Sequence, residues 1–369
     1  MKKNKLNVKL AKLAAGLLVL VAINTGCKKE NPPIGTANEG LNKFEQINLV
    51  ASNASYNALR VDPLLQNAWG IAISPTGNIW LSAEASGYSA VYNKEGVQLL
   101  PDVTIPSPTT TTNGQPTGIV FNNTMNFILP NGLPAKFVFA GADGVISGWN
   151  QGNLSAAVRV INNSATASYF GLTLASYQGV NYLYAANFKS GTIDVFDKDF
   201  NKVNIKFTDP NLPSGFYPYN VQLIDNSIYV TYAKIGDYGS EVLAAGAGIV
   251  NIFNTDGSFA KRFVTNGKLN APWGITKAPS SFFGADSAKY INTILVGNFG
   301  DGHINAFSAT GTFLGELRKN GEPININGLW GISFAPTSAT SIDPNRLYFN
   351  AGPSSEKDGL FGYITKKDK

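Results

Sequence analysis

The tripeptide Trp69-Gly70-Ile71 decides the fold, because close variants of it return at five later points in the chain. Each variant opens with an aromatic or polar residue, usually continues with glycine, and leads into a short apolar run. The interval is about 50 residues, and strand-like repeats of this length are typical of a β-propeller with one blade per repeat. The six phrases are Trp69-Gly70-Ile71, Thr117-Gly118-Ile119, Phe170-Gly171-Leu172, Tyr219-Asn220-Val221, Trp273-Gly274-Ile275 and Trp330-Gly331-Ile332.

A second phrase keeps the same interval, since an aromatic residue stands just before a polar turn in each repeat. Together the two phrases predict an all-β fold, a six-bladed β-propeller with four antiparallel strands per blade. In the third repeat the predicted strands cover residues 171–174, 182–186, 192–196 and 203–207. The aromatic residues of the second phrase are Tyr92, Trp149, Phe196, Phe253 and Phe307, with Tyr363 as a looser sixth.

The two ends of the domain predict how the ring closes. The sixth repeat has only three strand-like segments before the charged tail that ends at Lys369. One further strand-like segment, at about residues 44–51, precedes the first repeat. Because an exposed strand edge invites pairing with other chains, we expect this N-terminal strand to complete the last blade. The repeats then form a single domain over residues 43–369, although the length alone would suggest two or three domains.

The formal charge of +5 does not belong to the propeller. Five of the 29 basic residues are lysines that precede Cys27, and no acidic residue occurs there. The rest of the chain therefore carries 24 basic and 24 acidic residues. A neutral domain offers no electrostatic argument for binding nucleic acid, and we expect no such partner.

The N-terminal 27 residues have the features of an export signal. A basic start is followed by a mostly apolar run, residues 10–23, that is too short for a comfortable transmembrane helix. The only cysteine, Cys27, follows directly, which resembles a bacterial lipoprotein signal, although Asn24 stands where that signal prefers an aliphatic residue. We expect a signal peptide at 1–26, lipidation of Cys27, a flexible tether over 27–42, and a lipid-anchored protein of the cell envelope at the outer membrane. Ordinary secretion is the alternative.

Several distinctive phrases follow one another in a fixed order: Pro116-Thr117-Gly118-Ile119-Val120-Phe121, Gly144-Val145-Ile146-Ser147-Gly148-Trp149, Asn270-Ala271-Pro272-Trp273-Gly274, Val296-Gly297-Asn298-Phe299-Gly300-Asp301-Gly302, Asn327-Gly328-Leu329-Trp330-Gly331 and Asp358-Gly359-Leu360-Phe361-Gly362. With these phrases, residues 44–364 resemble a group of exported bacterial six-bladed β-propellers known as conserved hypothetical proteins. That resemblance implies the fold and export but no activity. A looser resemblance, carried by the turn at residues 253–257, links the chain to NHL-repeat propellers and to metal-dependent lactonases of the gluconolactonase type.

Loops between second and third strands bring polar residues to one end of the central channel. Carboxylate and amide oxygens are the ligands that Ca²⁺ requires, so the sequence predicts a ligand or metal site at this channel mouth, with Ca²⁺ as candidate cofactor. The lactonase resemblance implies a metal at the same end. Alternatively, these side chains satisfy the backbone of their own turns. The candidate residues are Glu84, Asp143, Asn187, Asn298 and Asp301.

Three tryptophans, Trp69, Trp273 and Trp330, start equivalent inner strands. Their rings would stack on a sugar or an aromatic ligand if they faced the channel mouth. The alternative is that they pack between neighbouring blades.

Two functions remain open. The first is a non-enzymatic envelope module that binds a protein or glycan partner, and the second is a metal-dependent hydrolase or lyase acting at the channel mouth. The chain has a single histidine, His303, and Cys27 is assigned to the anchor, which excludes a zinc site built from histidine and cysteine. A plugged channel would favour the binding module, whereas bound Ca²⁺ with an open coordination position would favour the enzyme.

Overall fold

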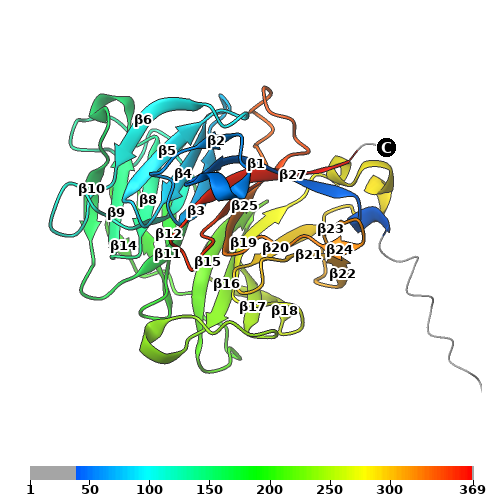
Figure 1. Cartoon of the computed structure of the whole chain (residues 1–369). Helices are drawn as coiled ribbons and strands as arrows, with labels where there is room; N and C mark the ends of the chain where they lie inside the picture. Colours follow the sequence, from blue (N-terminus) through cyan, green and yellow to red (C-terminus); the bar gives the residue numbers. More distant parts are fainter. Residues whose placement is uncertain (1–38, 368–369) are drawn as a thin grey trace, which may run out of the picture. The chain divides into compact units, whose positions relative to one another are not determined.

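The computed structural model describes residues 39–367, so the predicted signal peptide, Cys27 and most of the predicted tether lie outside it. The described residues form six antiparallel blades around a central axis (Figure 1). In every blade the strand that comes first in the repeat lies innermost, and the inner strands of successive blades contact one another around the ring. The fold is therefore the six-bladed β-propeller that the repeats predict.

Blades 1 to 5 each contain four strands that pair in sequence order. Blade 1 has β3 (Ala68–Ile73), β4 (Ile79–Ala83), β5 (Tyr88–Tyr92) and β6 (Gln98–Thr104); blade 2 has β7 (Pro116–Phe121), β8 (Phe137–Gly141), β9 (Val145–Trp149) and β10 (Val158–Asn162). Blade 3 has β11 (Tyr169–Tyr177), β12 (Val180–Asn187), β13 (Thr192–Phe196) and β14 (Lys202–Val203). Blade 4 has β15 (Phe216–Ile224), β16 (Ser227–Lys234), β17 (Gly248–Phe253) and β18 (Phe259–Thr265); blade 5 has β19 (Pro272–Lys277), β20 (Ile294–Asn298), β21 (Ile304–Phe307) and β22 (Phe313–Glu316).

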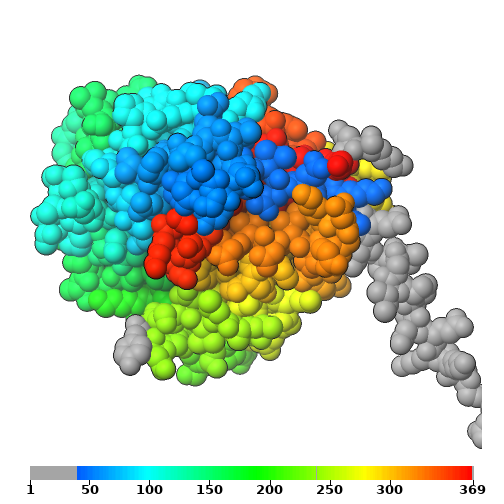
Figure 2. Space-filling model, in the orientation of Figure 1, coloured from blue at the N-terminus to red at the C-terminus, as the bar shows by residue number. Residues whose placement is uncertain are grey.

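Blade 6 closes the ring with strands from both ends of the domain. It contains β25 (Leu329–Ser333), β26 (Leu347–Ala351), β27 (Leu360–Lys366) and then β1 (Phe44–Ala51), which runs antiparallel to β27. The short strand β2 (Arg60–Val61) adds to the outer edge of β1. The predicted closure by an N-terminal strand is confirmed, and Figure 2 shows the N-terminal segment, in blue, against the C-terminal strands, in red.

The glycine in the repeated phrase lets adjacent inner strands approach closely. A Cβ atom on Gly70 would lie 2.4 Å from the Thr117 carbonyl oxygen, and one on Gly331 would lie 2.5 Å from that of Trp69. No side chain fits at these distances, so glycine is required. Blade 4 replaces this glycine with Asn220, whose Nδ2 instead donates a hydrogen bond to the Trp273 carbonyl oxygen at 2.8 Å.

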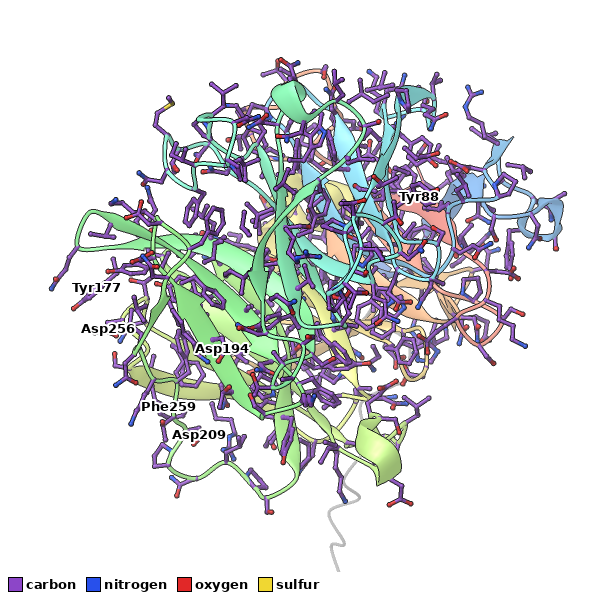
Figure 3. The ribbon with its side chains drawn as sticks, turned by 90° about the vertical axis from the view of Figure 1, so that its left-hand side faces the viewer. Tyr88, Tyr177, Asp194, Asp209, Asp256 and Phe259 are labelled. Carbon is purple, nitrogen blue, oxygen red and sulfur yellow. The ribbon has the colours of Figure 1, made fainter. Side chains whose placement is uncertain are left out.

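Three buried carboxylates on the flank of the propeller are each paired with a basic side chain. Asp194 on β13 pairs with Lys202 at 2.8 Å, and Asp209, which follows β14, pairs with Arg262 on β18. Figure 3 shows Asp194 on the strands of blade 3 and Asp209 beside a loop on the same side of the molecule. At the end of β22, Glu316 is flanked by a lysine and an arginine, with distances of 3.2 Å to Lys268 and 3.0 Å to Arg318. We call Asp194, Asp209 and Glu316 the flank carboxylates.

Short elements outside the blades cover the propeller. Leu41 in the 3₁₀ turn η1 (Glu39–Leu41) is fully buried and belongs to the same apolar cluster as residues of η5 (Ser280–Lys289). The packed domain thus includes residues 40 and 41, which the sequence assigns to the tether. The remaining short elements are η2 (Ala54–Tyr56), η3 (Gln151–Asn153), η4 (Asp237–Gly239), β23 (Arg318–Lys319) and β24 (Glu322–Pro323). Among the described residues no helix is long and apolar enough to cross a membrane.

Candidate functional site

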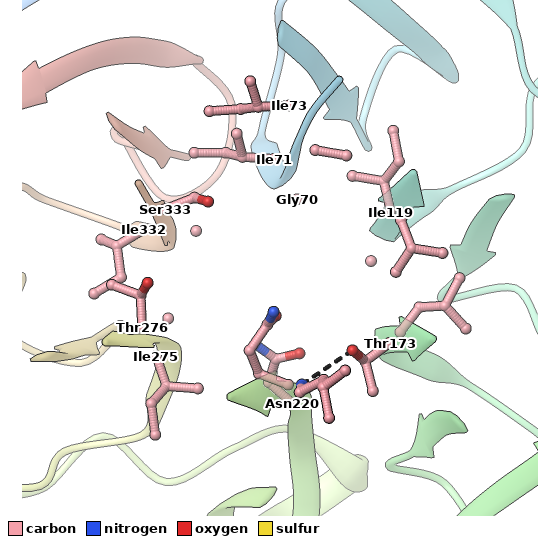
Figure 4. Close-up of a pocket in the computed structure, with 18 of the residues that line it drawn as sticks. Gly70, Ile71, Ile73, Ile119, Thr173, Asn220, Ile275, Thr276, Ile332 and Ser333 are labelled. Atoms are coloured by element: carbon pink, nitrogen blue, oxygen red, sulfur yellow. Dashed lines mark hydrogen bonds between the residues drawn. The ribbon is translucent and has the colours of Figure 1, made fainter. Parts of the chain in front are cut away.

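The inner strands enclose a cavity of about 290 Å³ on the axis of the propeller (Figure 4). Aliphatic side chains such as Ile71 and Ile275 form much of its wall, and Thr173 adds a polar group. Near the hairpins between first and second strands, the cavity continues into a groove of about 400 Å³ that shares Thr276 and Phe334 with it. The channel is therefore open towards the end that lies opposite the predicted mouth.

At the predicted mouth, aromatic side chains fill the channel. We define the aromatic plug as Trp69, Phe188, Tyr219, Trp273 and Trp330, which pack in one buried cluster. Each of these five side chains is no more than 5% exposed. Four of the five belong to the repeated phrase that opens the inner strands, so the periodic sequence that builds the ring also supplies the side chains that close it.

Trp330 is the centre of the plug. Its ring stacks on Trp69 at a centroid distance of 3.6 Å and on Phe299 at 4.0 Å. Trp273 meets both Trp69 and Trp330 edge-on, at 6.0 Å in each case. Aromatic pairs of this kind contribute roughly 0.5–1.5 kcal/mol each beyond the area that they bury. The three tryptophans predicted as stacking residues thus pack against one another, Trp69 stacked on Trp330 and Trp273 edge-on to both.

Asn67 connects the plug to two carboxyl groups at the mouth. Its Oδ1 accepts a hydrogen bond of 2.9 Å from the Trp330 indole N–H. Its Nδ2 donates to Oε2 of Glu84 and to Oε2 of Glu356, at 3.0 Å each. Asn67 is almost completely buried and has a φ of 45°, a left-handed conformation that asparagine tolerates better than most residues. One amide therefore connects both carboxyl groups to the indole N–H at the edge of the central tryptophan.

A third carboxyl group, that of Glu241, lies on the blade 4 side of the mouth. It comes from the loop after β16, where residue 241 forms an isolated β-bridge with Ile235. The Tyr219 phenol of the plug is close enough to lower the pKa of the Glu241 carboxyl, although burial raises that pKa more. The Tyr219 hydroxyl itself has no hydrogen bond of ordinary geometry. Burial, followed by the charges of Glu241 and Glu356, raises the pKa of this phenol well above its usual range.

We call Glu84, Glu241 and Glu356 the mouth carboxyls, and they share one electrostatic environment. Burial is the largest cause that raises the pKa of each of them. The charges of Glu241 and Glu84 raise the pKa of Glu356 further. Among the described residues none of the three forms an ion pair with a lysine, arginine or histidine. The mouth is thus a partly buried acidic site without its own counter-cation.

The five residues predicted as channel-mouth ligands do not form one hydrogen-bonded group. Asp143 lies near Glu84, because its charge contributes to the raised pKa of Glu84, and burial raises the pKa of Asp143 itself. Asn187 accepts from the backbone N–H of Ser190 in its own loop and from that of Ser168 just before β11, and it donates to Asp194. Asn298 donates to Asp301 at 3.1 Å within blade 5.

No metal centre is formed by the acidic, histidine and cysteine side chains that the structure describes. Among residues 39–367 no three of these side chains converge closely enough to hold a metal ion. A Ca²⁺ site of the kind the sequence predicts would also need oxygens from several loops on one centre. Asn187 and Asn298 instead use their amides to hold the backbone and neighbouring side chains.

Sequence reasoning missed Asn67, Tyr219, Glu241 and Glu356 as members of the mouth. Tyr219 was visible only as a variant of the repeated phrase, in the position that tryptophan occupies in other blades. Glu241 lies in the long insertion after β16, and Glu356 lies in the loop between β26 and β27, which has no counterpart of matching length in the other repeats. The loop after β16 is longer than its equivalents in the other blades and carries two acids, Asp237 and Glu241, and this length was the signal that would have pointed to Glu241.

Taken together, the fold and the plugged mouth define a six-bladed β-propeller whose loop-rich end carries unpaired carboxyl groups. No model of a protein family matches the chain. Two proteins of Acanthamoeba polyphaga mimivirus are similar in sequence. "Uncharacterized protein R648" is 33% identical over 337 residues, which cover 87% of this chain and 80% of that protein. "Uncharacterized protein L690" is 31% identical over 338 residues, which cover 87% and 86%. The chain belongs to the family of these viral proteins.

A solved structure supports the fold. The chain resembles a streptogramin B lyase with a TM-score of 0.50 and 14% identity, over 87% of this chain and 97% of the lyase. A putative gluconolactonase matches with a TM-score of 0.43 and 15% identity, over 69% of this chain and 79% of that protein. At such low identity only the propeller architecture follows. The relatives found in sequence are viral, whereas the sequence-based resemblance was to exported bacterial propellers.

Proposed function

We propose that this protein is a binding module, a lipid-anchored propeller of the envelope whose recognition face is the channel mouth. The observation that carries the proposal is the combination of an aromatic plug at the channel mouth and carboxyl groups without an ion-pair partner at the same end. The aromatic plug closes the mouth end of the channel, and among the described residues none of the mouth carboxyls forms an ion pair with a basic side chain. A protein or glycan partner of the envelope would meet this face.

The anchor in this proposal rests on the sequence around Cys27. Several acyl chains hold a protein at a membrane far more firmly than one, so lipidation would keep the propeller at the envelope. Metabolic labelling with a radioactive fatty acid tests it. The wild-type chain should incorporate label and partition into detergent, whereas Cys27→Ser should do neither. A labelled Cys27→Ser variant, or an unlabelled wild type, would remove the anchor from the proposal.

The competing function is a metal-dependent hydrolase or lyase at the same end. It would draw on Glu84 and Asp143, because buried carboxyl groups with raised pKa values suit general acid chemistry. Metal content of the purified protein and a melting curve with and without EDTA separate the two functions. The binding module predicts no stoichiometric metal, no shift of the melting temperature on adding EDTA, and no turnover in a lactone and ester screen. A tightly held cation together with turnover would overturn it.

A further inference from the structure

We propose that the central channel binds one uncharged sugar ring, which enters from the end of the propeller opposite the mouth. This inference goes beyond the proposed function, because it needs neither the lipid anchor nor the mouth carboxyls. A free monosaccharide and the terminal sugar of a glycan both present this chemistry.

The channel has the size and shape of a small-molecule site. Trp273 of the aromatic plug is one of its lining residues, so the plug forms its closed end. Its volume of about 290 Å³ equals that of roughly ten water molecules at about 30 Å³ each. One sugar ring fits this space, which lies near the lower end of the range for ligand pockets. The adjoining groove of about 400 Å³, beside Phe334 and Pro279, leaves room for a further ring outside the channel.

Four neighbouring blades place a polar side chain at the same point of the inner strand. This point lies three residues after the start of the repeated phrase, and blades 1 and 2 have Ala72 and Val120 there. All six residues line the channel. Figure 4 shows two of the polar residues, Thr276 and Ser333, across the open channel from Ile119. The wall therefore has a polar side and an aliphatic side. The polar residues of blades 3 to 6 are Thr173, Gln222, Thr276 and Ser333.

Two of these four polar side chains have no partner in the protein. Thr173 accepts a hydrogen bond from a backbone N–H at 3.0 Å, and Ser333 donates to a backbone carbonyl oxygen at 3.1 Å. Among residues 39–367 no hydrogen bond engages the side chain of Gln222 or Thr276, and both are only partly exposed. An amide and a hydroxyl each donate and accept. They therefore match sugar hydroxyls, which also do both.

The lining of the channel selects against charged and against purely apolar ligands. None of the described residues that line it is charged, and a charge buried there without a partner would be costly. In the adjoining groove, Lys277 and Asp225 pair with each other at 2.9 Å. A purely apolar chain would leave the Gln222 amide and the Thr276 hydroxyl without partners. A sugar ring satisfies both sides of the wall, since its C–H face packs on the aliphatic side while its hydroxyls meet the polar side.

Saturation-transfer difference NMR and isothermal titration calorimetry on the purified protein test the inference. The monosaccharide probes are glucose, mannose and N-acetylglucosamine, and the glycan probes are maltotriose and chitotriose. The test variant is Gln222→Leu/Thr276→Val, which nearly keeps the shape of the wall and removes the two unpartnered polar groups. A second variant, Val120→Phe, narrows the channel from its aliphatic side. The matched control, Gln151→Leu/Thr265→Val, makes the first pair of changes at exposed positions outside the channel. Far-ultraviolet circular dichroism and melting confirm that each variant is folded.

The expected result is that wild type and control bind at least one sugar, and that each channel variant binds it at least about 10-fold more weakly. Equal binding of monosaccharide and trisaccharide identifies a free sugar as the source, whereas tighter binding of a trisaccharide identifies the end of a glycan. No binding of any probe overturns the inference. Equal binding by wild type and Gln222→Leu/Thr276→Val also overturns it, because the sugar then binds outside the channel, and in that case the binding module with its mouth still stands.

Discussion

The flank carboxylates and the mouth carboxyls are both withdrawn from water, but only the flank carboxylates have cationic partners. Asp209 is 1% exposed at its side chain, pairs with Arg262, and accepts further bonds from Asn251 and from the backbone of Asn211. Burial alone would raise its pKa, yet these partners together hold that pKa below its usual value. At the mouth, Glu84 and Glu356 accept from one neutral amide, and burial keeps their pKa values raised.

The charges of the flank carboxylates therefore stabilise the folded protein, whereas the charges of the mouth carboxyls destabilise it. A buried carboxylate with a cation and several hydrogen bonds fixes neighbouring strands, and removing one partner is strongly destabilising. A partly buried carboxyl group without a cation lowers stability at neutral pH, since burial disfavours its charged form. Three such groups lie around one mouth. Natural proteins commonly accept a loss of stability at sites that bind.

The largest effect is expected from Trp330→Ala. This substitution tests whether aromatic packing or electrostatic interactions stabilise the mouth. The substitution leaves a cavity beneath Phe299 and removes the N–H partner of Asn67, so unfolding should require about 3–5 kcal/mol less free energy. Urea unfolding followed by tryptophan fluorescence and circular dichroism measures it. Met125→Ala, at an exposed apolar side chain, is the control and should change stability by less than about 0.5 kcal/mol. A loss below about 1 kcal/mol for Trp330→Ala would show that the plug is not the structural centre of the mouth.

A smaller effect should follow from Arg262→Met, which turns a flank carboxylate into an unpaired one. Asp209 would keep its bonds from Asn211 and Asn251 but lose its cation, at a cost of about 2–4 kcal/mol in unfolding free energy at neutral pH. Because the pKa of Asp209 is lowered in the folded protein, its contribution to stability is present above the unfolded pKa and disappears as the pH falls. The difference between Arg262→Met and wild type should therefore shrink in acid.

Chemical unfolding at neutral and acidic pH measures this, and a second substitution separates charge from packing. Asp209→Asn added to Arg262→Met should recover part of the loss, since it removes the orphaned charge. If the single and double variants are equally unstable, the pair acts through packing, and the contrast between flank and mouth loses its electrostatic basis.

The smallest effect, and one of opposite sign, is expected from Glu241→Gln. Removing a charge that burial disfavours should raise the melting temperature at pH 7 by about 2 °C. Asp199→Asn, which removes an exposed carboxylate paired with Lys198, should leave the melting temperature unchanged within error. Differential scanning calorimetry resolves shifts of this size. A lowered melting temperature for Glu241→Gln would mean that this carboxyl group is structural, as those on the flank are.

The architecture was predictable from the sequence because the strand-like phrases recur at a fixed interval and the turns between strands carry characteristic residues. The phrase around Trp69 and its five variants place the inner strands, and the three-strand final repeat leaves a place that β1 fills. The need for glycine at Gly70 and Gly331 also follows from the sequence, because only glycine repeats at that point in five of the six phrases. Strands that recur at a fixed interval leave few arrangements that bury their apolar faces.

The composition of the mouth could not be predicted in the same way, since it depends on loops that break the repeat. Asn187 and Asn298 were both predicted as ligands of one site at the channel mouth, yet the Asn187 amide bonds to Asp194 in blade 3 and the Asn298 amide bonds to Asp301 in blade 5. Glu241 and Glu356 lie in loops between second and third strands, as Glu84 does, but these loops are longer in blades 4 and 6 than in the other blades, so the spacing does not fix where the two side chains lie. Spacing in the sequence also does not reveal whether a tryptophan faces a ligand or another tryptophan.

The pH dependence of the unfolding free energy, compared between wild type and Glu84→Gln/Glu241→Gln/Glu356→Gln, tests the central claim most directly. The groups around these carboxyls are Asp143, Asn67 and the Tyr219 phenol, and none of them is a cation.

Raised pKa values mean that the three carboxyls favour the folded protein below the ordinary glutamate pKa and lose that contribution as the pH rises through their folded pKa values. The two proteins should therefore be equally stable in acid, and the triple variant should become the more stable one towards neutral pH. A wild type that gains stability over the variant as the pH rises would contradict the account, because the mouth carboxyls would then be paired as those on the flank are.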